Sequence, residues 1–138
     1  MTNRVLGRAE LLSRNHRRYT QESVLGFGEL RLRNLTAAEM RGFRRFLQTP
    51  AGEVDAERGA RLQELLIADT MVDEEDNLQF SREDALSGVF DNVDGALINR
   101  CFQLAKEWTG FSIDEDFSAL EQAIKNSNNG QASATPAA

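Results

Sequence analysis

The residues best spaced for chemistry lie in an acidic stretch between two expected helices. Six of them match the ligand positions of an EF-hand calcium loop: Asp73, Glu75, Asn77, Gln79, Ser81 and Asp84. However, the position that needs glycine for the sharp turn is Leu78, and Asp84 stands where a longer bidentate glutamate is usual. The stretch therefore predicts a solvated acidic turn and a helix cap at Ser81, without calcium.

Other nucleophilic and metal-ligating side chains are scarce. The chain has one cysteine, Cys101, and one histidine, His16. A single cysteine excludes an internal disulfide framework and a cysteine-clustered zinc site, and one histidine makes a histidine metal site or a catalytic triad hard to assemble. Cys101 falls on the apolar stripe of an expected helix, and no glycine-rich phosphate loop occurs. We therefore expect no catalysis, no metal and no cofactor.

Charge is divided along the chain, although the net value is −6. Residues 1–48 hold ten arginines against four glutamates, a net +6, and residues 49–138 carry −12. The arginines suggest a phosphate-binding patch, but few aromatic residues lie near them and nucleic-acid signatures are missing. We expect instead that Arg31 and Arg33, which share one strand face, make electrostatic contacts to the acidic remainder of the chain or to an acidic partner.

Targeting signals are not expected in this sequence. The first twenty residues contain frequent arginines and lack the apolar run of about 7 or more residues that a secretory signal needs. Nowhere do eighteen apolar residues run together, so we expect no membrane span and a cytoplasmic protein.

These residues must be positioned by secondary-structure elements, and the sequence patterns predict a mainly α fold with a short N-terminal β-hairpin (α+β) and about four to five helices. Residues 1–21 form a basic arm with a possible short helix, 22–125 the hairpin and helical domain, and 126–138 a disordered polar tail. Alternation around Gly26 predicts two strands joined by a glycine turn. Helices are predicted over 36–48, over 56–69, after Ser81, from Asp91 or Asn92 to Gly110, and from Ser112 to about Lys125, with a brief strand at 78–80.

Three stretches, in this order, resemble the tail assembly chaperones of long-tailed bacteriophages and prophages. The first is residues 27–39, with alternating Leu and Arg followed by Leu-Thr and a helix that opens with Glu; the second is 72–84, a Val-Asp turn followed by Phe-Ser and a helix start; the third is 104–117, closed by Lys125-Asn126-Ser127. One departure is Asp76-Asn77, where family members often have glycine.

The resemblance implies a non-catalytic protein of the host bacterial cytoplasm. Such chaperones bind the long, aggregation-prone tape measure protein and help tail tube subunits assemble around it, and many are also made as a longer frameshifted form that contacts the tail tube protein. A structural tail or neck component of the virion and an arginine-mediated nucleic-acid-binding regulator remain alternatives.

Aromatic residues near helix ends suggest where a client would bind. We expect an apolar groove formed by Leu86, Val89, Phe90, Trp108 and Phe111. For Trp108 and Phe111, core packing is the competing interpretation. The charge division also predicts attraction between opposite regions, within one chain or between copies, that salt weakens.

Overall fold

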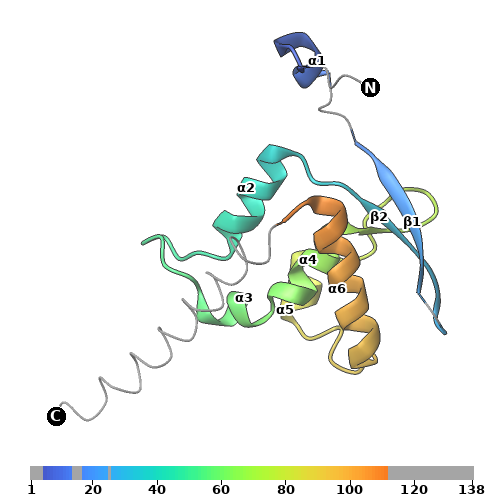
Figure 1. The fold of residues 1–138 in the computed structure, drawn as a ribbon. Coiled ribbons are helices and arrows are strands. Elements are labelled where there is room, and N and C mark those ends of the chain that lie inside the picture. The colour runs from blue at the N-terminus through green and yellow to red at the C-terminus, as the bar shows by residue number, and fades with distance from the viewer. Residues whose placement is uncertain (1–4, 14–16, 25, 112–138) are drawn as a thin grey trace.

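A computed structural model of the chain describes residues 5–13, 17–24 and 26–111. Six helices and three strands lie within these ranges, in the order α1 (Arg8–Leu12), β1 (Tyr19–Val24), β2 (Gly28–Arg33), α2 (Ala37–Phe46), α3 (Ala56–Ala60), α4 (Leu62–Thr70), β3 (Met71–Val72), α5 (Arg82–Leu86) and α6 (Gly95–Thr109) (Figure 1). The predicted α+β class, mainly helical with an N-terminal hairpin, is confirmed. The predicted last helix and the polar tail lie outside the described residues.

The strands form one antiparallel sheet in the order β1-β2-β3. β1 and β2 make the predicted hairpin in unbroken register from Tyr19 opposite Arg33 to Val24 opposite Gly28, and Gly26 has a φ of +83° in the turn. β1 begins at Tyr19, so the predicted arm boundary at residue 21 lies inside the strand. Of the predicted strand 78–80, only Leu78 pairs, in a single bridge to Val72.

The third strand was not predicted, because two residues are too few to show an alternating pattern. Met71 and Val72 follow directly on α4 and pair with Leu32 and Arg31 of β2. This pairing attaches the end of a buried helix to the hairpin. It arises from a long-range contact, which no local sequence pattern encodes.

Helix ends follow the predicted capping residues. The Thr36 hydroxyl accepts from the Glu39 amide at 3.2 Å while the Glu39 carboxylate accepts from the Thr36 amide at 2.9 Å. Ser81 and Asp84 make the same reciprocal pair at α5. Gly110 ends α6 with a φ of +78°, a left-handed backbone that favours glycine.

Two predicted helices differ from the structure. The helix predicted over 56–69 is divided at Arg61, whose φ of −107° and ψ of 24° depart from helical geometry. This break leaves α3 near the surface and lets α4 bury six consecutive residues, 65–70. The long helix begins after Asp94, not at Asp91 or Asn92, because Asp94 accepts from the amides of Ala96 and Leu97.

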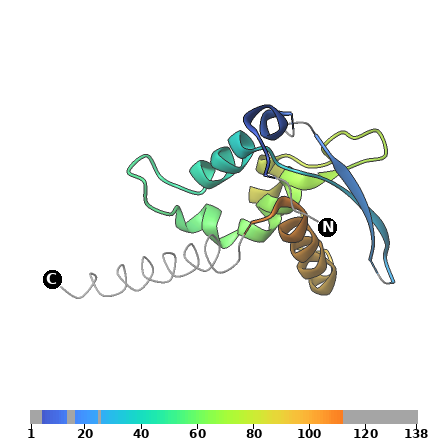
Figure 2. The same ribbon diagram turned by 45° about the horizontal axis from the view of Figure 1, so that its top comes forward.

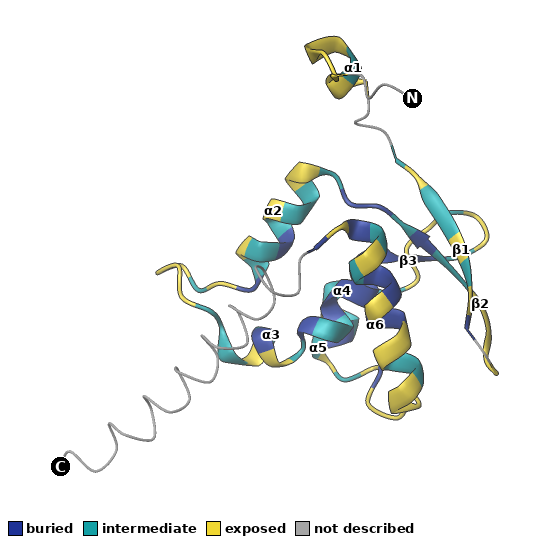
Figure 3. Ribbon diagram, in the orientation of Figure 1, coloured by how far each residue is buried: buried dark blue, intermediate teal, exposed yellow. Residues whose placement is uncertain are grey.

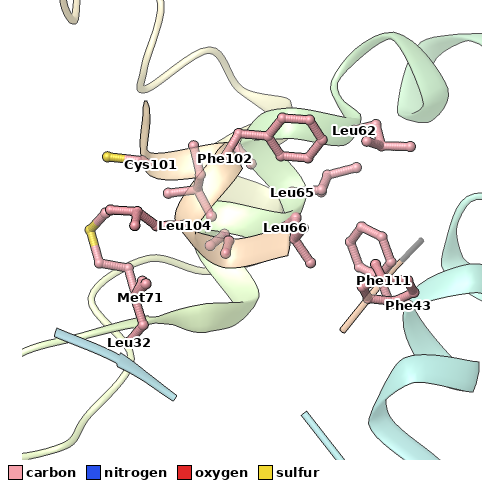
Figure 4. Close-up of a cluster of buried hydrophobic side chains, with 14 of the residues drawn as sticks. Leu32, Phe43, Leu62, Leu65, Leu66, Met71, Cys101, Phe102, Leu104 and Phe111 are labelled. Carbon is pink, nitrogen blue, oxygen red and sulfur yellow. The ribbon is translucent and has the colours of Figure 1, made fainter. Parts of the chain in front are cut away.

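The core lies around α4. Figure 3 shows α4 almost wholly buried, with α5 and α6 packed beside it, the sheet against α6, and α1 apart. Figure 4 shows how leucines of α4 face phenylalanines from other elements. Core residues include Leu32, Phe43, Leu65, Leu66, Phe102, Leu104 and Phe111. One continuous apolar cluster therefore joins the hairpin to α2, α4 and α6.

Candidate binding surfaces

The five residues of the predicted client groove have different surroundings. Leu86 is the last residue of α5, and Val89 and Phe90 lie in the turns that follow it. Trp108 and Phe111 lie at the C-terminal end of α6, a helix of fifteen residues and so about 22 Å long. The first group therefore precedes this helix, whereas Trp108 lies in its last turn and Phe111 just beyond its end.

Two members of the predicted groove are core residues. Phe90 is 7% exposed, and its ring packs edge-on against Phe80 with 4.7 Å between centroids. Phe111 is 5% exposed and packs against Phe43 with 5.6 Å between centroids. A client can contact these rings only if the core opens, so they are poor candidates for direct binding. Whether the groove binds a client remains a prediction.

The other members are partly accessible. Val89 is 48% exposed, and Leu86 and Trp108 are half-buried. The Arg18 guanidinium lies 4.7 Å from the Trp108 ring centroid, a cation–π contact that ties the residue before β1 to α6. Beside the end of α6 is a shallow concavity of about 390 Å³, lined by Gln103, Lys106, Glu107 and Phe111.

Arg31 and Arg33 make electrostatic contacts within the chain. The Arg31 Nε donates to the Asp76 carboxylate at 2.5 Å, a bond that raises the pKa of the guanidinium, and Arg31 also lies over Tyr19. The Arg33 Nε donates to the Asp69 carbonyl oxygen at 2.7 Å, and burial lowers the pKa of Arg33. The basic hairpin is thus bound to the acidic part of the same chain.

Glu39 joins the arm, the hairpin and α2. Its carboxylate accepts from Arg17 at 2.6 Å and lies 3.7 Å from the Arg33 guanidinium. The Arg17 hydrogen bond lowers the pKa of Glu39 from its ordinary 4.5 to about 2, although partial burial opposes this. Sequence analysis identified Glu39 only as part of a helix cap, since its arginine partner lies 22 residues away.

A second ionic cluster was also missed by the sequence analysis. Arg82 donates two hydrogen bonds to the buried Asp69 carboxylate, at 3.0 and 2.8 Å. The Arg82 and Arg58 guanidinium groups lie 4.7 and 4.2 Å from the ring of Phe46. This cluster joins α2, α3, α4 and α5 through charge-assisted hydrogen bonds and cation–π contacts.

The acidic turn is folded by its own carboxylates. Asp73 accepts from the amides of Glu75 and Asn77 at 2.8 and 3.1 Å, and Asp84 caps α5. Asp76 has a φ of +69°, the left-handed region in which glycine is free of strain and aspartate is tolerated. No group of three or more His, Cys, Asp or Glu placed to bind a metal occurs within residues 5–13, 17–24 and 26–111.

A concavity of about 510 Å³ lies between the hairpin and this turn. Its lining is Gln21, Glu29, Leu30, Arg31, Val72, Asp73, Glu74 and Gln79. The one arginine already pairs with Asp76, and the remaining charges are acidic. Away from this concavity, Cys101 is buried on α6, and burial raises the pKa of its thiol. The described surface therefore presents binding features more clearly than a set of converging catalytic groups.

Residues 5–12, which include α1, expose more large apolar side chains than any other described stretch of the chain. Within residues 5–12, Val5, Leu6, Leu11 and Leu12 are between 52% and 88% exposed, and α1 buries no residue. Figure 1 shows α1 beyond the N-terminal end of β1, apart from the core helices. We call these four side chains the apolar arm. Clustered exposure of this kind marks interaction sites more often than scattered single residues do.

Comparisons of the chain with protein-family models, curated proteins and solved structures found no match. Among the helices of the described part of the chain, none has the length and apolar character needed to cross a membrane.

Proposed function

We propose that this protein is a tail assembly chaperone of a long-tailed bacteriophage or prophage. In this role it binds the tape measure protein in the host cytoplasm and promotes assembly of the tail tube around it, without catalysis. Contact with the tail tube protein itself would come from a longer frameshifted form. The basis for the family is the resemblance of residues 27–39, 72–84 and 104–117.

The observation that carries the proposal is the exposure of the apolar arm. A tape measure protein is long and helical, and it needs its apolar stripes covered before the tube encloses it. A short helix that exposes Leu11 and Leu12 supplies such cover by apolar helix pairing. Because α1 buries no residue in its own domain, this contact leaves the fold intact.

The stretches that resemble the family lie at structural boundaries, which supports the proposal. The first contains β2 and the capping box of α2, and the second contains the acidic turn and the capping box of α5. The sequence departs from the family pattern at Asp76-Asn77, but Asp76 keeps the positive φ for which glycine is suited. The departure is therefore compatible with the same turn.

Co-expression with the tape measure protein of the same genome tests the proposal. The Leu11→Ser/Leu12→Ser variant should lose most of the client from the soluble fraction, while its melting temperature stays unchanged. A matched control, Phe27→Ser/Val93→Ser, removes two exposed apolar side chains outside both the arm and the predicted groove and should keep the client soluble. If the arm variant protects the client as well as the wild type does, the arm is not the client-binding surface.

Two further measurements separate the alternatives. Mass spectrometry of purified virions should find no copies of this protein, and its presence there would indicate a structural tail or neck component. A steep fall of DNA affinity with rising salt would indicate a nucleic-acid-binding regulator instead. A wild-type protein that fails to keep the tape measure protein soluble would refute the chaperone function itself.

A further inference from the structure

β1 is an edge strand with an unpaired outer side. The sheet order is β1-β2-β3, and no described residue pairs with β1 on the side away from β2. The Arg18 carbonyl accepts from the Asn34 amide at 3.0 Å and the Val24 carbonyl from Phe27 at 2.9 Å, so even-numbered residues direct their backbone groups inward. Tyr19, Gln21 and Ser23 therefore direct their N–H and C=O groups outward.

Within the described residues, Glu22 is the only one of the usual protections against strand pairing that this edge carries. Natural edge strands are commonly shortened, bulged or interrupted by proline or lysine. β1 has six residues, Tyr-Thr-Gln-Glu-Ser-Val, in continuous register with β2. Figures 1 and 2 show the hairpin extending past the helices on one side of the molecule. The edge is thus long, regular and accessible.

We propose that a second copy of this chain pairs with β1, antiparallel and with Thr20 opposite Thr20, to give a continuous six-stranded sheet. Opposite charges on Arg18 and Glu22 favour a second copy as the partner strand, and they favour this alignment of the two strands over its neighbours. With Thr20 at the symmetry axis, Arg18 of each copy lies opposite Glu22 of the other. Shifting the axis to Gln21 places Arg18 opposite Val24, and shifting it to Glu22 places two glutamates face to face.

The backbone geometry supports these two ion pairs. Arg18, Thr20 and Glu22 have the same parity, so their side chains share one face of the sheet. Their backbone groups point inward, so across the new interface they form non-hydrogen-bonded pairs, in which side chains lie closest. The Trp108 ring already holds the Arg18 guanidinium, and Arg18 is exposed. An unrelated extended peptide would gain the backbone hydrogen bonds but not the symmetric ion pairs.

A charge-exchange experiment tests the register. Sedimentation equilibrium of the full chain in 0.1 M NaCl should show a dimer that weakens as salt increases. Arg18→Glu and Glu22→Arg each replace two opposite-charge pairs with two like-charge pairs, and each should weaken the dimer about tenfold. An equimolar mixture of these two variants should regain wild-type affinity, because each copy then supplies the charge that the other needs.

A backbone variant tests the edge itself. Gln21→Pro removes an outward N–H and leaves the bonds to β2, so it should abolish the dimer, whereas Gln21→Ala should not. Circular dichroism checks that both variants fold. A monomeric wild type, a dimer unaffected by Gln21→Pro, or a mixture that fails to regain affinity would each overturn the proposal. These outcomes are independent of client binding, which the arm variants measure.

Discussion

Replacing Glu39 with glutamine should separate its ionic contribution from its role as a helix cap. The carboxylate has two functions: one oxygen accepts from the Thr36 amide, and the other accepts from Arg17. Glutamine keeps a carbonyl oxygen for the cap, a substitution that capping boxes accept. The variant therefore removes mainly the charge that pairs with Arg17 and Arg33.

The pKa of Glu39 sets the expected magnitude. A fall from 4.5 to about 2 corresponds to about 3 kcal/mol of favourable interaction with the charged form. Because 31% of the side chain is exposed, solvent screening reduces the contribution to about 1–2 kcal/mol. We expect Glu39→Gln to lower the free energy of unfolding by that amount at pH 7.

The pH dependence gives the decisive measurement. The folded protein holds the pKa of Glu39 below the unfolded value, so the stabilisation is complete above pH 4.5 and is lost as the pH falls toward 2. Urea unfolding at pH 7 and pH 3 should show that less than half of the penalty remains at pH 3. An exposed glutamate in the first turn of α5, changed as Glu83→Gln, should shift stability by no more than about 0.5 kcal/mol at pH 7. A penalty equal at both pH values would refute the ionic explanation.

The remaining predictions concern helix ends and the core. Gly110→Ala should lower the free energy of unfolding in urea by about 1 kcal/mol, because the φ of +78° strains any side chain even though nothing lies within 4 Å of the new Cβ. Gly42→Ala inside α2 should instead raise it by about 0.5–1 kcal/mol. Equal effects of the two substitutions would contradict this backbone argument. Phe90→Ala should cost about 3 kcal/mol, and Val89→Ala less than about 0.5 kcal/mol. A Phe90→Ala variant that melts like the wild type would mean that this ring does not belong to the core.

The fold was predictable where the signals are local. A side chain that caps a helix acts within three residues, so Thr36 and Ser81 marked two helix starts correctly. The alternation of Leu30 and Leu32 with arginines indicated a half-buried strand. The break at Arg61 was not visible, because an amphipathic pattern continues across it and only the packing of α4 against α6 reveals the change of direction.

The candidate binding surfaces were harder to predict. Aromatic residues near helix ends suit a groove as well as a core, and burial of Phe90 and Phe111 distinguishes the two only after the chain has folded. The apolar residues of α1 gave little indication of their role, since a short apolar helix can pack against its own domain. Exposure is a property of the whole structure, and the apolar arm became recognisable through it.

The sequence by itself determined the α+β class, the hairpin, the main helix caps and the division of charge. These depend on contacts between near neighbours and on composition, which require no knowledge of distant segments. Only the tertiary structure decided which arginine meets which carboxylate, that Asp69 is buried beside Arg82, and that β3 joins the sheet. These pairings span from 13 residues, for Arg82 and Asp69, to 45, for Arg31 and Asp76, and packing of the core around α4 brings them together.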